Sequence, residues 1–130
     1  MTSRALIVDD ETVVREVFRI QLEGWDFEVT ACDTRSEAVK LAEVTDFDLV
    51  IADASLPDGD GLEILKAVRK RSPRAPVFLT SEDWSPEARA TAEKLGGMAL
   101  YKPCDWQRLQ ELVSRELDSA GKGQGSKPTE

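Results

Sequence analysis

The sequence predicts an α/β fold in which a parallel sheet of five strands is covered by helices on both faces. Short apolar runs alternate along the chain with polar segments whose apolar residues recur at helical spacing. Some runs are apolar at every position, as in Leu6-Ile7-Val8 and Leu49-Val50-Ile51, which is typical of strands buried on both faces. The chain has 130 residues, 41% of them hydrophobic, which suits one compact domain.

The predicted strands are spaced so that a helix fits between each pair. They comprise residues 5–8, 27–31, 47–52, 77–79 and 98–101. The second strand alternates between apolar and polar residues and includes Glu28, so we expect it at an edge of the sheet. The continuously apolar strands, those with Leu6-Ile7-Val8 and Leu49-Val50-Ile51, are expected at central positions.

Helix start and stop signals support the predicted helices. Two pairs have the spacing of a capping box, namely Thr34 with Glu37 and Asp60 with Glu63. Ser85-Pro86-Glu87 opens a further helix with proline at its preferred first position, and Gly96-Gly97 closes it.

The helix predicted over residues 87–95 is poor in large apolar residues. Its inward side consists mostly of Ala88, Ala92 and Leu95. We therefore expect this helix to pack lightly and to move easily.

Composition excludes several classes of function. With 25 acidic and 17 basic residues the net charge is −8, which argues against direct nucleic-acid binding. The chain has no histidine, which removes Ser-His and Cys-His nucleophiles, histidine metal ligands and histidine phosphocarriers. The apolar run before Asp9 is too short for a signal peptide or a membrane span, so we expect a cytoplasmic protein. Cys32 and Cys104 are expected to be reduced thiols.

Polar residues follow four of the predicted strands. In strand order they are Asp9, Asp10 and Glu11, then Asp53, then Thr80 and Ser81, then Lys102-Pro103. In a parallel α/β sheet the carboxyl ends of the strands face one crevice, where ligands bind. If the first and third strands are neighbours, the three aspartates share a small pocket, which is costly unless a cation or proton relieves the repulsion.

Oxygen ligands without histidine or thiol favour a hard divalent cation, and Mg²⁺ suits a few carboxylates best. With Lys102 as a positive charge and Thr80 or Ser81 as a hydroxyl donor, the set indicates a phosphoryl-transfer site. Taken singly, an acidic pair at a strand end is more often a capping turn, with Asp10 or Thr12 as the cap. The interpretation depends on the combination from different strands.

Over about residues 4–117 the chain resembles the receiver domain of bacterial two-component response regulators. The resemblance is carried by Leu6-Ile7-Val8-Asp9-Asp10-Glu11, by Leu49-Val50-Ile51-Ala52-Asp53 with Leu56-Pro57 and Gly61, by Leu79-Thr80-Ser81, and by Lys102-Pro103. It implies a doubly wound, flavodoxin-like sheet with strand order 2-1-3-4-5.

The resemblance also implies a role for each site residue. Asp53 is the phosphoacceptor, and Asp9, Asp10 and Asp53 hold Mg²⁺ together with the main-chain carbonyl of Ser55. Lys102 contacts the phosphoryl group and a hydroxyl donor assists. The implied partners are a sensor histidine kinase or phosphotransfer protein and an output domain or partner protein. The chain would catalyse only its own phosphoryl transfer and slow autodephosphorylation.

The chain departs from the family pattern near the fourth and fifth strands. From Pro76 onward the fourth strand is one residue short, so Thr80 matches by its distance to Lys102, whereas Ser81 matches by its distance from Pro76. We choose Thr80 and keep Ser81 as the alternative. Family members commonly carry an aromatic residue where this chain has Ala99. We therefore expect the output to depend on moving the helix over 87–95 and the loop that carries Trp84.

The domain is expected to span residues 1–117. Residues 118–130 have the composition of a flexible tail or linker, either a chain end or a tether to an output domain. A hydrolase of the haloacid-dehalogenase type is an alternative, weakly imitated by Asp9 and Glu11-Thr12, and a receiver-like binding protein without phosphorylation is another. The sequence leaves homodimer formation open.

Overall fold

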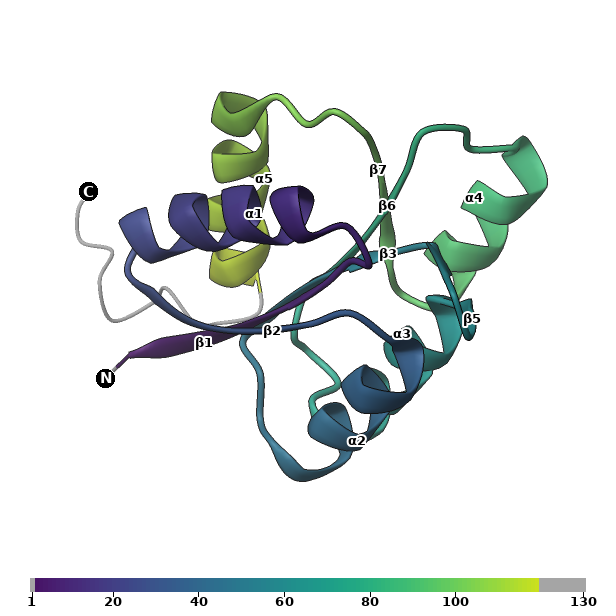
Figure 1. Cartoon of the computed structure of the whole chain (residues 1–130), viewed down its shortest axis with the longest axis horizontal. Helices are drawn as coiled ribbons and strands as arrows, with labels where there is room; N and C mark the ends of the chain where they lie inside the picture. Colours follow the sequence, from purple (N-terminus) through teal and green to yellow (C-terminus); the bar gives the residue numbers. More distant parts are fainter. Residues whose placement is uncertain (1, 120–130) are drawn as a thin grey trace.

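Five apolar segments pair side by side as one parallel sheet in the computed structural model, which describes residues 2–119. The strands are β1 (Ser3–Val8), β2 (Phe27–Cys32), β3 (Leu49–Asp53), β6 (Val77–Ser81) and β7 (Met98–Tyr101). Their order is β2-β1-β3-β6-β7 (Figure 1), so the predicted order is confirmed and β2 lies at an edge as expected.

Helices cover both faces of this sheet (Figure 1). They are α1 (Thr12–Gly24), α2 (Arg35–Val44), α3 (Leu62–Arg71), α4 (Pro86–Lys94) and α5 (Trp106–Ser119). Alternation along the strands divides the core in two. Ile7 and Phe78 pack with α1 and α5, whereas Leu6 and Leu79 pack with α2, α3 and α4. The central strands β1, β3 and β6 thus supply apolar side chains to both layers, which explains the continuously apolar runs.

Two of the predicted helix starts are confirmed by hydrogen bonds. The Thr34 hydroxyl accepts from the main-chain N–H of Glu37 at 3.2 Å. The Ser85 hydroxyl accepts from the N–H of Ala88 at 3.1 Å, and Pro86 is the first residue of α4. Each bond satisfies a donor that the first helical turn would otherwise leave free.

The third predicted cap is wrong. The N-cap of α3 is Gly61, and the Asp60 carboxylate accepts from the N–H of Leu62 at 3.0 Å instead of from that of Glu63. The cause is a two-stranded antiparallel ribbon that the sequence analysis missed, formed by β4 (Ser55–Leu56) and β5 (Gly59–Asp60). Because Asp60 belongs to this ribbon, the helix begins later than the spacing predicts.

Helix α4 packs lightly, as expected. Ala92 is its one buried residue within the described chain. Leu95 packs partly against the core, but Ala88 is exposed, which corrects the expectation that it points inward. Little apolar burial therefore holds α4 against the sheet.

Helix α5 continues to Ser119, so Asp118 and Ser119 are helical rather than part of the predicted tail. Residues 120–130, the rest of that tail, lie outside the described residues. Within residues 2–119, none of the helices combines the length and apolar character needed to cross a membrane.

Candidate functional site

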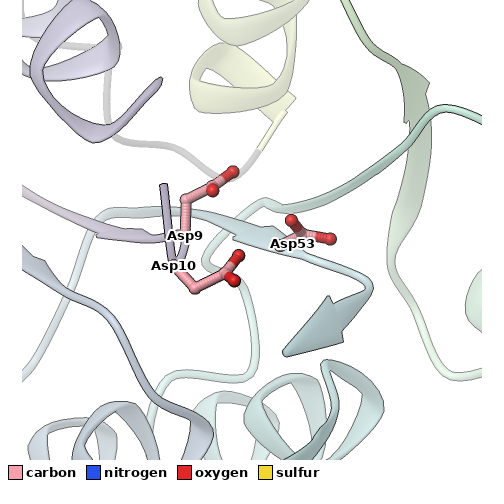
Figure 2. Close-up of side chains that lie close together, drawn as sticks. All are labelled: Asp9, Asp10 and Asp53. Carbon is pink, nitrogen blue, oxygen red and sulfur yellow. The ribbon is translucent and has the colours of Figure 1, made fainter. Parts of the chain in front are cut away.

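The three aspartates predicted from the sequence meet at the carboxyl ends of β1 and β3. Val8 at the end of β1 pairs with Ala52, so Asp9 and Asp53 follow on adjacent strands. Carboxylate oxygens of Asp9, Asp10 and Asp53 all lie within 4.8 Å of one another, and Figure 2 shows them around a common space. The predicted acidic pocket is therefore present.

Main-chain hydrogen bonds fix the two buried carboxylates. Oδ1 of Asp9 accepts from the N–H of Glu11 at 2.9 Å, and Oδ1 of Asp53 accepts from the N–H of Ser55 at 3.0 Å. Both are local turns in which an aspartate bonds the main chain two residues on. Each leaves Oδ2 as the oxygen that other groups can approach.

Lys102 joins the two carboxylates from the end of β7. Its Nζ lies 2.8 Å from Oδ2 of Asp53 and 2.9 Å from Oδ2 of Asp9. The Lys102 side chain is only 13% exposed, and that of Asp9 only 2%. Burial by itself would lower the pKa of Lys102, but hydrogen bonds and charges from Asp53 and Asp9 outweigh it and raise that pKa above its usual range.

The acidic pocket fits a hard divalent cation. Oδ2 of Asp9 is buried and accepts no well-aligned hydrogen bond in the described part of the chain, so Lys102 is its counter-charge.

Glu11 is the N-cap of α1 and makes no side-chain capping bond; neither Asp10 nor Thr12 caps this helix. Among residues 2–119, the exposed Asp10 carboxylate has no hydrogen bond or ion pair. Carboxylate oxygens of this kind suit Mg²⁺, which keeps several water ligands.

Two hydroxyls end β6 on opposite faces of the sheet. Thr80 is 1% exposed, and its Oγ1 donates to the carbonyl of Ala52 at 3.5 Å. Ser81 is partly exposed, and its Oγ accepts from the N–H of Asp83 at 3.1 Å. Side chains alternate along a strand, so Ser81 faces the α3 and α4 layer with Leu79, whereas Thr80 faces the α1 and α5 layer.

Arg15 is a site residue that the sequence analysis missed. Its guanidinium donates from Nη1 to the main-chain carbonyl of Asp9 at 2.9 Å and from Nη2 to Oγ1 of Thr12 at 3.3 Å. It therefore fixes the peptide between the two acidic residues from the first turn of α1. Its position one helical turn after Glu11 could have indicated this contact.

Both cysteines are free, as predicted. Cys32 is buried at the end of β2, and burial, with the charges of Glu37 and Asp33, raises the pKa of its thiol to about 12. Burial also raises the pKa of the Cys104 thiol. Thiols held neutral in this way are weak nucleophiles, so neither contributes an activated cysteine to the site.

Comparison with known proteins identifies relatives along most of the chain. The family described as response regulator receiver domain matches residues 5–114. Response regulator protein PilR of Pseudomonas aeruginosa is 36% identical over 115 residues, which cover 88% of this chain and 26% of PilR. Transcriptional regulatory protein ZraR of Salmonella typhimurium is 30% identical over 113 residues, covering 86% of this chain and 26% of ZraR. The chain thus spans about a quarter of the length of these relatives.

Solved structures share the fold. A CheY-like receiver domain protein from Methanospirillum hungatei has a TM-score of 0.87 and 28% identity, covering 94% of this chain and 98% of its own. The beryllofluoride-activated NtrC4 receiver domain dimer has a TM-score of 0.82 and 25% identity, covering 90% of this chain and 98% of its own.

Proposed function

This chain belongs to the response regulator receiver domain family, whose function is phosphorylation-based switching, and we propose that Asp53 is the residue that becomes phosphorylated. The phosphoryl donor is a sensor histidine kinase or a phosphotransfer protein. One observation carries the proposal: the Asp53 carboxylate lies 2.8 Å from the Lys102 ammonium and within 4.8 Å of the other two acidic side chains. The family match supports this function over that of a dehalogenase-type hydrolase.

In the proposed reaction an oxygen of the Asp53 carboxylate attacks phosphorus and forms a new P–O bond. The bond from phosphorus to the donor's imidazole nitrogen breaks, and its electron pair returns to the imidazole. Lys102, already at Oδ2 of Asp53, balances the charge of the incoming phosphoryl oxygens.

Receiver domains bind Mg²⁺ at an acidic pocket, and the carboxylates of Asp9, Asp10 and Asp53, with the main-chain carbonyl of Ser55, would hold it in this chain. The ion supplies positive charge to the phosphoryl oxygens when bound. The buried Oδ2 of Asp9, whose counter-charge among residues 2–119 is Lys102, supports this assignment.

The hydroxyl that meets the phosphoryl group is a separate assignment. Its spacing from Lys102 in the sequence predicts Thr80, whose hydroxyl is buried and directed at Ala52. We propose Ser81, the alternative that the sequence leaves open, because this residue is partly exposed and its hydroxyl, within the described chain, bonds only to the N–H of Asp83 in its own loop. Thr80→Val and Ser81→Ala remove one hydroxyl each, and the variant with the larger loss of beryllofluoride affinity identifies the donor.

A protein donor would approach beside Lys102, where α1 and the start of α5 border an apolar groove. The groove has a volume of about 290 Å³, and its lining includes Val13, Val17 and Trp106. Val13 is 74% exposed. Val13→Asp should slow phosphorylation by a protein donor while leaving labelling by acetyl phosphate unchanged.

We propose that the chain acts in the cytoplasm and passes its signal to an output domain or a partner protein. It would catalyse only its own phosphorylation and slow dephosphorylation. The net charge of −8 supports the view that this segment does not itself bind nucleic acid. Phosphorylation could also promote a homodimer, a state recorded for the NtrC4 receiver domain.

Intact-mass spectrometry after incubation with acetyl phosphate and Mg²⁺ tests the assignment of Asp53. The expected result is one added phosphoryl group on the parent chain and none on Asp53→Asn. Asp60→Asn is the matched control, since Asp60 also follows β3 but lies outside the acidic cluster. Undiminished labelling of Asp53→Asn would overturn the proposal.

A further inference from the structure

The loop between β6 and α4 is tied down at two points. At its start the hydroxyl of Ser81 accepts from the N–H of Asp83 at 3.1 Å. At its end the indole Nε1–H of Trp84 donates to the main-chain carbonyl of Leu100 on β7 at 2.8 Å. Only Glu82 and Asp83 therefore separate the residue whose hydroxyl lies at the candidate site from the residue that bonds the neighbouring strand.

Trp84, which makes this hydrogen bond, also lines a cavity. The cavity has a volume of about 230 Å³, and its other lining residues come from the residue after β3 and from β5, α3, β6 and α4: Ala54, Asp60, Leu62, Leu79, Ala88 and Thr91. The ring packs partly against the core on the α4 side, where α4 itself buries only Ala92 among the described residues. The indole thus has space beside it, and α4 has few contacts that oppose movement.

We propose that Trp84 is a latch: its hydrogen bond to Leu100 holds α4 in the position of the unphosphorylated protein, and phosphorylation of the site breaks that bond. This inference rests on the proposed function, because the release begins with Ser81. When the Ser81 hydroxyl turns toward a phosphoryl oxygen, the N–H of Asp83 loses its acceptor and the loop shifts. The Trp84 N–H then leaves Leu100, and its ring moves into the cavity together with α4.

No large buried side chain of β7 links the end of β6 to α4. Ala99 faces the α4 layer, since its neighbours Met98 and Leu100 pack on the opposite side of the sheet, and its methyl group has no rotamer to change. Tyr101 on the same face is 52% exposed. Trp84 is thus the aromatic side chain that connects the end of β6, α4 and β7.

A latch made only in the unphosphorylated arrangement resists activation, because it is a contact that one state has and the other lacks. Trp84→Phe removes the indole donor and keeps most of the ring. One neutral hydrogen bond corresponds to about a fivefold change in an equilibrium constant. Trp84→Phe should therefore bind beryllofluoride with Mg²⁺ about fivefold more tightly than the parent, and α4 should exchange its amide protons faster before activation.

The direct test is the indole N–H resonance of Trp84 in ¹H–¹⁵N NMR spectra, identified by its loss in Trp84→Phe. Beryllofluoride should shift it upfield and accelerate its exchange with water, while the Trp25 indole signal stays unchanged. Trp25→Phe is the matched control for affinity, since Trp25 lies at the end of α1 and packs in the other half of the core. It should bind beryllofluoride as the parent does.

The outcomes distinguish failure of the Trp84 latch from failure of the proposed phosphorylation site. If beryllofluoride shifts the amide signals of Asp53 and Ala54 but the Trp84 indole keeps its shift and protection, the latch is wrong and the phosphorylation site stands. Equal affinity of Trp84→Phe and the parent also overturns the latch. If beryllofluoride binds neither protein, the proposed function fails and the latch fails with it.

Discussion

Replacing Lys102 by methionine tests the electrostatics of the site most directly. The methionine side chain has similar length, but it leaves the carboxylates of Asp9 and Asp53 facing each other without the ammonium that lies 2.9 Å and 2.8 Å from their Oδ2 atoms. We expect Lys102→Met to be strongly destabilised without metal, because removing one partner leaves the other charges buried.

The magnitude follows from the contacts and their burial. At an effective dielectric constant of about 20, each contact contributes roughly 6 kcal/mol of attraction, much of which is offset by the cost of burying the charges. Removing one partner of a buried pair typically costs about 3–5 kcal/mol, which lowers the melting temperature of a domain of this size by roughly 12–20 °C. Side-chain exposures of 2% for Asp9 and 12% for Asp53 place this cluster among buried pairs.

Urea unfolding and thermal melts of four proteins provide the measurement: the parent, Lys102→Met, Asp53→Asn and the double variant. The double variant should recover part of the loss, because asparagine removes one of the two facing charges. Millimolar Mg²⁺ should stabilise Lys102→Met more than the parent, because a bound cation replaces part of the positive charge that the variant has lost. A deficit under about 0.5 kcal/mol at pH 7, the range of an ordinary surface substitution, would refute the reasoning.

Three further predictions concern the site and its supports. Asp10→Ala should lose most of its Mg²⁺ affinity by calorimetry yet melt no lower than the parent in chelator, since it relieves like-charge repulsion; a clear loss of stability without metal would contradict this. Gly61→Ala should lower the free energy of unfolding, measured with urea, by roughly 2 kcal/mol or more, because the added Cβ would lie 2.5 Å from the main-chain oxygen of Asp53. Cys32, with its thiol pKa raised from 9.0 to about 12, keeps its proton in the folded state where the unfolded chain loses it, so stability should fall as pH rises from about 9 to 12. In Cys32→Ala the melting temperature should fall less steeply over this pH range. An unchanged pH dependence would show that the Cys32 thiol is not the cause.

Where one local cause dominated, the sequence predicted the element correctly. Apolar segments located all five strands of the main sheet, and the uninterrupted runs Leu6-Ile7-Val8 and Leu49-Val50-Ile51 lie in the central strands β1 and β3, since strands covered on both faces need apolar side chains on both. Thr34 and Ser85 gave two helix starts, because a cap is a hydrogen bond within four residues. The light packing of α4 followed from its small side chains.

Errors arose where a neighbouring element changed the local outcome. The spacing of Asp60 and Glu63 fits a capping box, but pairing of β4 with β5 puts Asp60 in a ribbon and moves the helix start to Gly61. Ala88 has the helical spacing of an inward residue, yet it is exposed beside the cavity that Trp84 borders. The cavity has no signature within one segment of the sequence, whereas the ribbon has one that the sequence analysis passed over: Pro57-Asp58-Gly59 is a turn sequence that joins its two short strands.

The sequence by itself determined the fold class, the strand positions and the identity of the charged residues at the strand ends, because apolar periodicity and residue chemistry are local properties. The strand order was implied by family resemblance, and the tertiary structure alone decided which charges meet. Asp9, Asp53 and Lys102 are far apart along the chain, and their contacts at 2.8–2.9 Å exist because three parallel strands end at one edge of the sheet. The same packing decided that Ser81 faces α4 and that Trp84 bonds Leu100. Alternation along a strand separates its side chains into two faces, but only the packed structure shows which helix covers each face.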